Sequence, residues 1–289
     1  EANTVTGGIR NAGILNVIDS IIARNTANSE GGGIDSDWSL TIIRSSIYRN
    51  SAGQYGGGIS NNGSLTLTNS TVSWNSAASS TFGGGGIFNE INGSSNFTAT
   101  NSTISFNRAP IGGGVFNNIG TINFKNTIIS DNSSTGSGPD FQGELNSQGY
   151  NLIENTVGLT IVGTTTGNIL GQDARLDPIL RSNGGATPTH ALRVGSSAID
   201  QGAVVTPTAL ITDQRGLIRP FNFSSIPNAP GGNGSDIGAF ERQTNDVTVA
   251  VPFDYDGDGK ADISVYRQSG GSWWMRSSEN GSMCALGWG

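Results

Sequence analysis

The sequence is short of the residues that build disulfide-stapled or zinc-clipped domains. Its 289 residues include one cysteine, Cys284, and one histidine, His190. A single cysteine excludes an intramolecular disulfide framework and zinc-finger spacing. A histidine with no second histidine or cysteine beside it is a poor metal ligand, so we expect His190 to be a hydrogen-bonded structural residue.

Charge is also scarce, and it is spread thinly along the chain. Only 13% of the residues are charged, and the 15 lysines and arginines form no cluster within a net charge of −7. This distribution argues against a nucleic acid or an anionic membrane as partner. No stretch reaches the roughly 18 consecutive apolar residues that a membrane-spanning helix needs. The chain begins within a repeat, so we expect Glu1 to be a cleavage site or the start of a fragment.

What the chain has in abundance is glycine, with 44 residues, together with asparagine, serine and threonine in repeated segments. The stretch "NGSLTLTNSTVSWNSA" resembles its neighbours on both sides. Five such segments open with a glycine followed by a β-branched residue, at Gly8-Ile9, Gly33-Ile34, Gly58-Ile59, Gly86-Ile87 and Gly114-Val115. The intervals of 25, 25, 28 and 28 residues are typical of a solenoid.

Apolar residues recur at fixed places in each repeat and alternate with polar ones. Besides the β-branched residue after glycine, there are three columns: Leu15, Leu40, Leu65, Phe97, Ile122; Val17, Ile42, Leu67, Ala99, Phe124; and Ile22, Ile47, Val72, Ile104, Ile129. Alternation within a repeat indicates strands with one buried face. Recurrence between repeats indicates parallel pairing of equivalent strands. We therefore predict an all-β fold, a right-handed parallel β-helix with these columns stacked inside.

An asparagine follows the last apolar column by three residues in every repeat. These asparagines are Asn25, Asn50, Asn75, Asn107 and Asn132. We interpret them as a ladder of amides bonded along the helix axis, in a left-handed turn conformation that asparagine tolerates. A row of ligand-binding amides is the alternative. A second, shorter ladder is expected at Asn69, Asn101 and Asn126. The glycine runs are expected to mark turns and close backbone approach rather than phosphate-binding loops.

The periodicity divides the chain into three parts. Residues 1–170 are expected to form the β-helix coils, residues 171–245 irregular final coils, and residues 246–289 a separate β-hairpin unit. Since the open ends of a solenoid expose unpaired edges, we expect the middle part to cap one end. Asp213, Arg215 and Arg219 could form a buried polar cluster that fixes this cap, with a catalytic role as the less favoured interpretation.

The middle part carries an ordered series of short motifs. They are Asn183-Gly184-Gly185, Thr189-His190-Ala191-Leu192, Gly195-Ser196, Ala198-Ile199-Asp200, Asp213-Gln214-Arg215-Gly216 with Arg219, and Asp236-Ile237-Gly238-Ala239-Phe240-Glu241. With the coils, this series resembles the "choice-of-anchor Q" β-helix proteins, which are similar to polymorphic outer-membrane-protein repeats. The resemblance implies a right-handed β-helix exported to the bacterial cell surface. It implies no established activity, so it identifies no catalytic residue.

The strongest chemical motif is "DYDGDGKAD" near the end of the chain. Carboxylates at positions one, three, five and nine of a tight glycine-containing loop direct their oxygens to one point, and a backbone carbonyl supplies position seven. These residues are Asp254, Asp256, Asp258, Asp262 and, through its carbonyl, Lys260. Hard oxygen ligands in a flexible loop favour calcium. A solvated acidic turn is the alternative.

The loop differs from an EF-hand because its twelfth position has no glutamate and its flanks are predicted strands. Residues 246–289 instead resemble a single FG-GAP or VCBS-type repeat, a resemblance that implies calcium binding by the four aspartates. A propeller needs several such repeats. The unit is therefore expected to be truncated or to dock on a partner.

Together these features predict a non-enzymatic, extracellular or cell-surface structural or adhesive protein that can self-assemble into fibres through its C-terminal segment. The expected partners are further copies, other surface proteins or glycans, with calcium as the bound ion.

Two alternatives stay open. A polysaccharide lyase or hydrolase would need an acidic pair or a base beside a cation. Asp19, Arg44 and Asn69 occupy equivalent positions in successive repeats, and no acidic pair recurs. Ice or carbohydrate-surface binding could use an outward array of hydroxyls at Thr41, Thr66, Thr68, Thr98 and Thr100.

Overall fold

The computed structural model describes residues 7–89, 95–205, 210–244, 246, 263–267, 272–276 and 283–287. It contains two compact units, Glu1–Arg242 and Gln243–Gly289. The described residues form strands and turns, and none of them is helical. The described part of the chain therefore contains no helix long and apolar enough to cross a membrane. In the first unit, equivalent strands pair in parallel and form a β-solenoid of six coils, which confirms the predicted fold class at that level.

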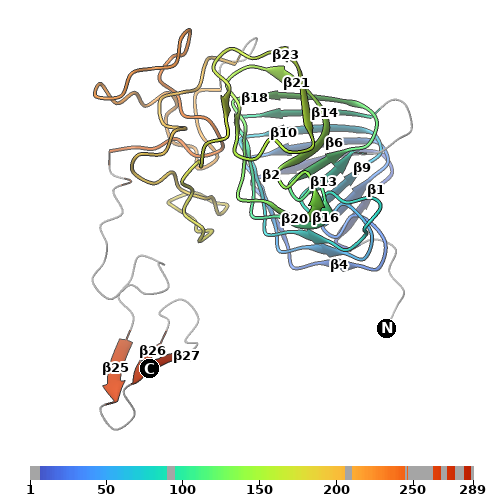
Figure 1. Ribbon diagram of the computed structural model, residues 1–289, viewed down its shortest axis with the longest axis horizontal. Helices are drawn as coiled ribbons and strands as arrows, with labels where there is room; N and C mark the ends of the chain where they lie inside the picture. The colour runs from blue at the N-terminus through green and yellow to red at the C-terminus, as the bar shows by residue number, and fades with distance from the viewer. Residues whose placement is uncertain are drawn as a thin grey trace. The chain divides into compact units, whose positions relative to one another are not determined.

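Each coil contributes strands to successive columns, which stack along the solenoid axis (Figure 1). The first column contains β1 (Ile9–Asn11), β5 (Ile34–Ser36), β9 (Ile59–Asn61), β13 (Ile87–Asn89) and β17 (Val115–Asn117). The second contains β2 (Ile14–Ile18), β6 (Ser39–Ile43), β10 (Ser64–Thr68), β14 (Asn96–Thr100) and β18 (Thr121–Lys125). The longer strand β21 (Phe141–Gln148) pairs with both columns and joins them into one sheet, which β23 (Leu159–Thr164) extends.

Two further columns complete the coils. The third contains β3 (Ile21–Ala23), β7 (Ser46–Tyr48), β11 (Thr71–Ser73), β15 (Thr103–Ser105), β19 (Ile128–Ser130), β22 (Leu152–Ile153) and β24 (Ile169–Leu170). The fourth contains β4 (Thr26–Ala27), β8 (Ser51–Ala52), β12 (Ser76–Ala77), β16 (Arg108–Ile111) and β20 (Ser133–Ser137). Strands β21 to β24 pair with the regular columns, so the stack continues beyond the fifth repeat to Leu170.

The predicted apolar columns are confirmed by the strand register. Leu65 of β10 pairs with Leu40 on one side and Phe97 on the other, and Val72 of β11 pairs with Ile47 and Ile104. The four apolar columns predicted from the sequence, which come from the first three columns of strands, belong to one continuous buried cluster. No coil could bury its apolar residues alone, so stacking like on like is what makes the core.

The first asparagine ladder is confirmed, but its turn conformation was predicted at the wrong residue. The side-chain amide nitrogen of Asn50 donates to the Asn75 Oδ1 at 3.0 Å, and Asn75 donates to Asn107 at 3.0 Å. Each amide also donates to a backbone carbonyl of the preceding coil, such as Ile22 for Asn50. The positive φ belongs to the preceding residue, for example 56° at Trp74. The backbone turns there, which lets the asparagine itself point inward.

The second ladder is shorter than expected, and a third was missed. Asn126 donates to Asn101 at 2.9 Å, whereas the Asn69 amide donates to the carbonyl of Thr212. A separate column runs through β9, β13 and β17, where the amide nitrogen of each asparagine donates to the next at 2.7 and 3.0 Å. The residues of this third ladder are Asn61, Asn89 and Asn117. Their spacing follows the first apolar column, so the sequence did contain the signal.

The glycine runs serve close backbone approach, as predicted. A Cβ placed on Gly58 would lie 2.6 Å from the carbonyl oxygen of Gly86 in the next coil and 3.0 Å from the Asn75 amide nitrogen. Neither atom can move without breaking the stack, so the first ladder and the glycine column depend on each other.

Residues 171–242, which we call the lateral segment, lie along the side of the solenoid (Figure 1). The hydroxyl of Ser46 in β7 donates to the Pro188 carbonyl at 2.6 Å, and the Thr103 hydroxyl in β15 accepts from the Ala239 amide at 3.0 Å. The position expected from the sequence, across one end of the stack, therefore differs from the observed one. The outward residues of the third column of strands are mainly serines and threonines, and their hydroxyls form hydrogen bonds that hold the lateral segment.

The second unit contains three described strands that pair antiparallel in chain order. They are β25 (Ile263–Arg267), β26 (Ser272–Arg276) and β27 (Met283–Gly287). The predicted calcium ligands Asp254, Asp256, Asp258, Lys260 and Asp262 lie outside the described residues.

Candidate functional site

His190 lies between the solenoid and the lateral segment, where it is buried. One ring nitrogen bonds to the Ser73 hydroxyl at 2.8 Å and the other to the Asp177 carbonyl at 2.7 Å. Burial lowers the pKa of His190 to about 4, so the ring is neutral at physiological pH. Both nitrogens are occupied by protein groups, which is the arrangement of a structural histidine.

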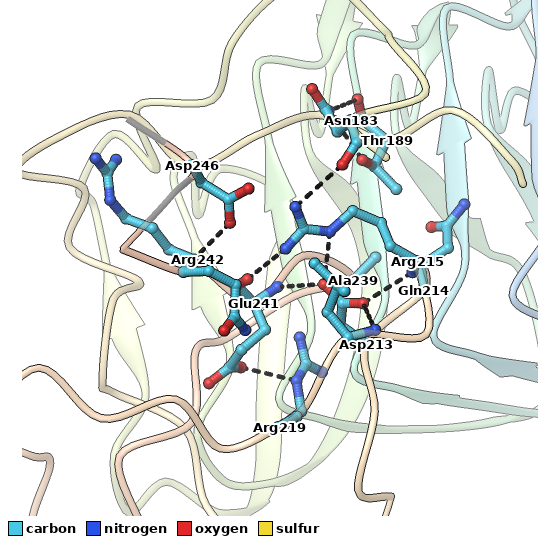
Figure 2. A network of polar contacts seen from close by, with 12 residues as sticks. Asn183, Thr189, Asp213, Gln214, Arg215, Arg219, Ala239, Glu241, Arg242 and Asp246 are labelled. Carbon is cyan, nitrogen blue, oxygen red and sulfur yellow. Dashed lines mark hydrogen bonds and ion pairs between the residues drawn. The ribbon is translucent and has the colours of Figure 1, made fainter. Parts of the chain in front are cut away.

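The expected polar cluster exists, and it is buried inside the lateral segment (Figure 2). The Arg215 guanidinium donates to Asp213 at 2.8 Å, and the Arg219 guanidinium donates to Glu241 at 2.8 Å. Arg215 also lies 3.7 Å above the centre of the Phe240 ring. All four charged side chains are at most 2% exposed. We call these four residues the buried ion network.

The buried ion network organises backbone rather than presenting chemistry to a ligand. The Glu241 carboxylate accepts from the backbone amides of Phe221 and Asp236, at 2.6 and 2.9 Å. The Asp213 carboxylate accepts from the amide of Glu241 at 3.0 Å. Burial raises the pKa of Asp236, and the Glu241 charge raises it further. Because these oxygens bind the chain itself, the network holds loops that have no regular secondary structure.

A second, partly exposed cluster of ionisable groups lies beside a hollow between the solenoid and the lateral segment. Carboxylate oxygens of Asp131, Glu154 and Asp173 lie within 4.8 Å of one another. The hollow has a volume of about 380 Å³. Its lining combines acidic, basic and apolar side chains: Phe106, Asp131, Asp173, Arg175, Leu176, Pro178, Arg193 and Val194.

Local geometry brings the first two of these carboxylates together. Asp131 has a φ of 58° at the turn after β19, and its backbone amide donates to the Glu154 carboxylate at 2.8 Å. Although the Asp131 side chain is partly exposed, partial loss of hydration in the hollow raises its pKa to about 6, and repulsion by Glu154 adds to the shift. The Ser130 hydroxyl, 3.2 Å from Asp131, and the nearby Arg193 partly oppose it. The group therefore titrates close to neutral pH.

Three carboxylates at this separation could act as an acid–base pair or draw a positively charged group. The sequence prediction missed them because they come from three different contexts. Asp131 belongs to the last regular coil, Glu154 follows β22, and Asp173 begins the lateral segment. Only the path of the lateral segment along the solenoid brings Asp173 back to the other two.

The threonines that the sequence suggested as an outward hydroxyl array lie on neighbouring coils. Thr66 of β10 pairs with Thr41 and Thr98 on the outer face of the second column, between Asn16 and Asn123. The threonines are half-buried, and their rows are three coils long at most.

Asp19 and Arg44 form an ion pair with two hydrogen bonds of 2.7 Å. The hydrogen bond from Arg44 lowers the pKa of Asp19, so this position offers no general acid.

No family model, no curated protein and no solved structure matches the chain. The structure alone therefore gives the class of the protein, which is an all-β parallel β-solenoid. Enzymes and non-enzymes share this fold, so function has to be argued from the sites.

Proposed function

We propose that the chain is a non-enzymatic structural or adhesive protein of the bacterial cell surface or the extracellular medium. The observation that carries the proposal is the use of its polar groups. The described asparagine ladders bond coil to coil, and the buried ion network bonds loop to loop. These polar groups stabilise the fold itself, and a rigid fold suits a structural protein that spaces or joins other molecules at a surface.

The dimensions of the solenoid support this role. Five steps between six coils, at about 4.8 Å per step, give a rod roughly 24 Å long with extended faces. Its surface combines hydroxyls and amides with few charges, and its single cysteine makes the fold independent of redox conditions. The motif series of the lateral segment supports export to the cell surface through its resemblance to choice-of-anchor Q proteins.

A binding and turnover experiment tests the proposal. The purified chain is incubated with neutral and acidic glycans and with intact bacterial cells, while retained protein and released sugar are both measured. The proposal predicts retention on one of these surfaces without reducing-end or unsaturated products. Product release that Asp131→Asn abolishes would replace the structural role with an enzymatic one.

A carbohydrate-active enzyme is the second candidate, and the hollow is the specific observation that favours it. Retaining glycosidases use two carboxyl groups about 5 Å apart, and the carboxylates of Asp131 and Asp173 approach within 4.8 Å. In that case Asp131, with its raised pKa, is the acid and Asp173 the partner. The same glycan screen separates the two functions, with Asp173→Asn as the second variant.

Calcium binding at Asp254, Asp256, Asp258, Lys260 and Asp262 is part of the proposed function and is supported by the loop sequence. Titration calorimetry with calcium should give one site in the parent chain and none in Asp256→Ala. Equal heats for both proteins would remove calcium from the proposal.

A further inference from the structure

One outer edge of the solenoid, where the third column of strands turns into the fourth, carries an unusual row of side chains. Five successive coils each place a residue with positive φ at this turn, with values from 55° to 61°. These residues are Arg24, Arg49, Trp74, Phe106 and Asp131. Glu154 continues the row in the sixth coil, because its carboxylate accepts from the Asp131 amide. We call these six residues the edge row.

The edge row is ordered by chemistry. Two cations come first, two aromatic rings follow, and two carboxylates come last. The rings of Trp74 and Phe106 are stacked, with centres 4.9 Å apart and planes inclined by 8°. Neighbouring members are one coil apart, about 4.8 Å. Arg24, Arg49, Trp74 and Asp131 are exposed, whereas Phe106 and Glu154 are half-buried.

This order is self-complementary when one copy is turned end for end. A two-fold axis between Trp74 and Phe106 places cations opposite carboxylates at both ends and rings opposite rings in the centre. Interfaces of two-fold dimers have this property, since the same patch serves both subunits. We propose that the edge row is a contact between two antiparallel copies of this chain, with Arg49 facing Asp131 of the second copy and Arg24 facing its Glu154.

The acidic end offers both room and charge for an incoming arginine. Asp131, Glu154 and Asp173 lie within 4.8 Å of one another beside the hollow of about 380 Å³. Two arginines of the same chain line the hollow, but both are engaged elsewhere. Arg193 pairs with Asp177 at 3.6 Å, and Arg175 donates to the Gly195 carbonyl at 3.4 Å. An arginine from a second copy would therefore relieve repulsion among the three carboxylates that Arg193 offsets only in part.

The basic end is the matching half. Arg24 and Arg49 are exposed, and no described carboxylate pairs with either of them. By contrast, Arg10 and Arg44 on other turns each pair with an aspartate of the neighbouring coil, at 2.8 and 2.7 Å. Arg10 and Arg44 therefore find their counter-charges within the solenoid. The edge row separates its opposite charges by two coils instead.

The central rings also favour a second copy over a linear glycan. Sugar rings stack on the open faces of aromatic side chains, but Trp74 and Phe106 each cover a face of the other. The other neighbour of Phe106 is the His190 ring, with centres 4.8 Å apart. Trp74 is 43% exposed, which leaves part of its indole for edge-to-face packing against the ring pair of a second copy. The inference deepens the proposed structural role by naming the partner and the surface.

Charge exchange between two variants tests the contact. Sedimentation velocity of the 289-residue chain over a range of concentrations should show a monomer–dimer equilibrium that weakens with added salt. Arg49→Glu and Asp131→Arg should each weaken dimerisation roughly tenfold or more, because each puts like charges together. A mixture of the two variants should form the heterodimer with an affinity within about threefold of the parent homodimer, because both facing pairs are again opposite in charge.

Lys125→Glu is the matched control, since it reverses a charge on the outer face of β18, away from the edge row. It should leave dimerisation unchanged. Circular dichroism confirms that every variant is folded, and an arginine already occupies the equivalent turn in two other coils. A monomeric parent chain, or a mixture that does not associate better than either variant, would overturn the inference. Neither result would affect retention on glycans or cells, so the proposed function is tested separately.

Discussion

The solenoid and the lateral segment each have a buried interior, and they build it by opposite means. In the solenoid, apolar columns fill the interior and neutral amides link the coils. In the lateral segment, no strand longer than an isolated bridge is described, and two buried ion pairs replace the missing ladder. In a repeated chain, the backbone N–H and C=O groups of one coil bond to those of the next coil. In an irregular chain, side chains have to supply the hydrogen bonds that the backbone groups need.

This difference has energetic consequences. Neutral amides bonded at about 3.0 Å cost little to bury, and each added coil repeats the same favourable contacts. Buried ions carry a large desolvation cost, which only well-placed partners offset. The lateral segment should therefore be more sensitive than the solenoid to the loss of a single partner. The following changes test this contrast from the largest expected effect to the smallest.

A charge inside an apolar column should be the most damaging change. Leu67→Asp would bury a carboxylate with no partner in the centre of the solenoid, where Leu67 is fully buried. We expect a loss of more than about 4 kcal/mol in the free energy of unfolding, measured by denaturant titration. Thr66→Asp, on the outer face of the same strand, should cost less than about 1 kcal/mol. Equal losses would contradict the column assignment.

Removing one member of the buried ion network should have a large but local effect. Arg219→Met leaves the Glu241 carboxylate without its cation and should cost about 3 kcal/mol. Limited proteolysis should then cut within residues 171–242 while far-ultraviolet circular dichroism retains the β signal of the coils. Arg193→Met is the control, because Arg193 is 58% exposed and its partner is 3.6 Å away. Simultaneous loss of both regions would show that they unfold as one unit.

Breaking the first ladder in its middle should cost less. Asn75→Ala removes the amide that accepts from Asn50 and donates to both Asn107 and the Ile47 carbonyl. Partners left without hydrogen bonds in a buried site cost about 2 kcal/mol. Asn16→Ala, at an exposed position of β2, should change the melting temperature little. A ladder variant as stable as this control would mean that the amides are dispensable.

The smallest effect concerns pH and Asp140, which ends the first ladder by accepting from the Asn132 amide at 3.0 Å. Burial raises the pKa of Asp140 from its ordinary 3.8 to about 7. The folded state thus holds this proton more tightly, so the stabilisation is complete below 3.8 and is lost as pH rises through about 7. Between pH 6.5 and 8, we expect a loss of about 1 kcal/mol.

Asp140→Asn should flatten that slope, as followed by thermal denaturation across the same pH range. Asp19→Asn should leave the slope unchanged, because Arg44 holds the pKa of Asp19 low. His190 acts in the opposite direction, since its lowered pKa destabilises the fold as pH falls from 6.5 towards 4. The chosen window avoids that contribution. An unchanged slope in Asp140→Asn would assign the pH dependence to other acids, such as Asp236 and Glu241.

The solenoid was predictable because each column is a one-dimensional pattern. Leu65 is inside because Leu40 and Phe97 are at the same place in neighbouring repeats, and no long-range information is needed. The same logic located the first asparagine ladder. It assigned the left-handed residue one position too late, because asparagine tolerates that conformation and Trp74 gives no local sign of adopting it.

The hollow and the lateral segment were not predictable in this way. Asp131 and Glu154 are 23 residues apart in different sequence contexts, and Asp173 reaches them only through the path of the segment along the solenoid. That path depends on single hydrogen bonds, such as the one from Ser46 to Pro188, which no periodicity reveals. The motif series indicated a buried polar cluster correctly, but not the surface against which it packs.

Hydrogen exchange followed by mass spectrometry tests the central contrast most directly. The account predicts slow exchange of the ladder and column amides of the solenoid, with faster exchange across residues 171–242. In Arg219→Met, exchange of the lateral segment should accelerate while the coils keep their protection. A single common rate for both regions, in the parent and in the variant alike, would contradict the separate origins of their stability.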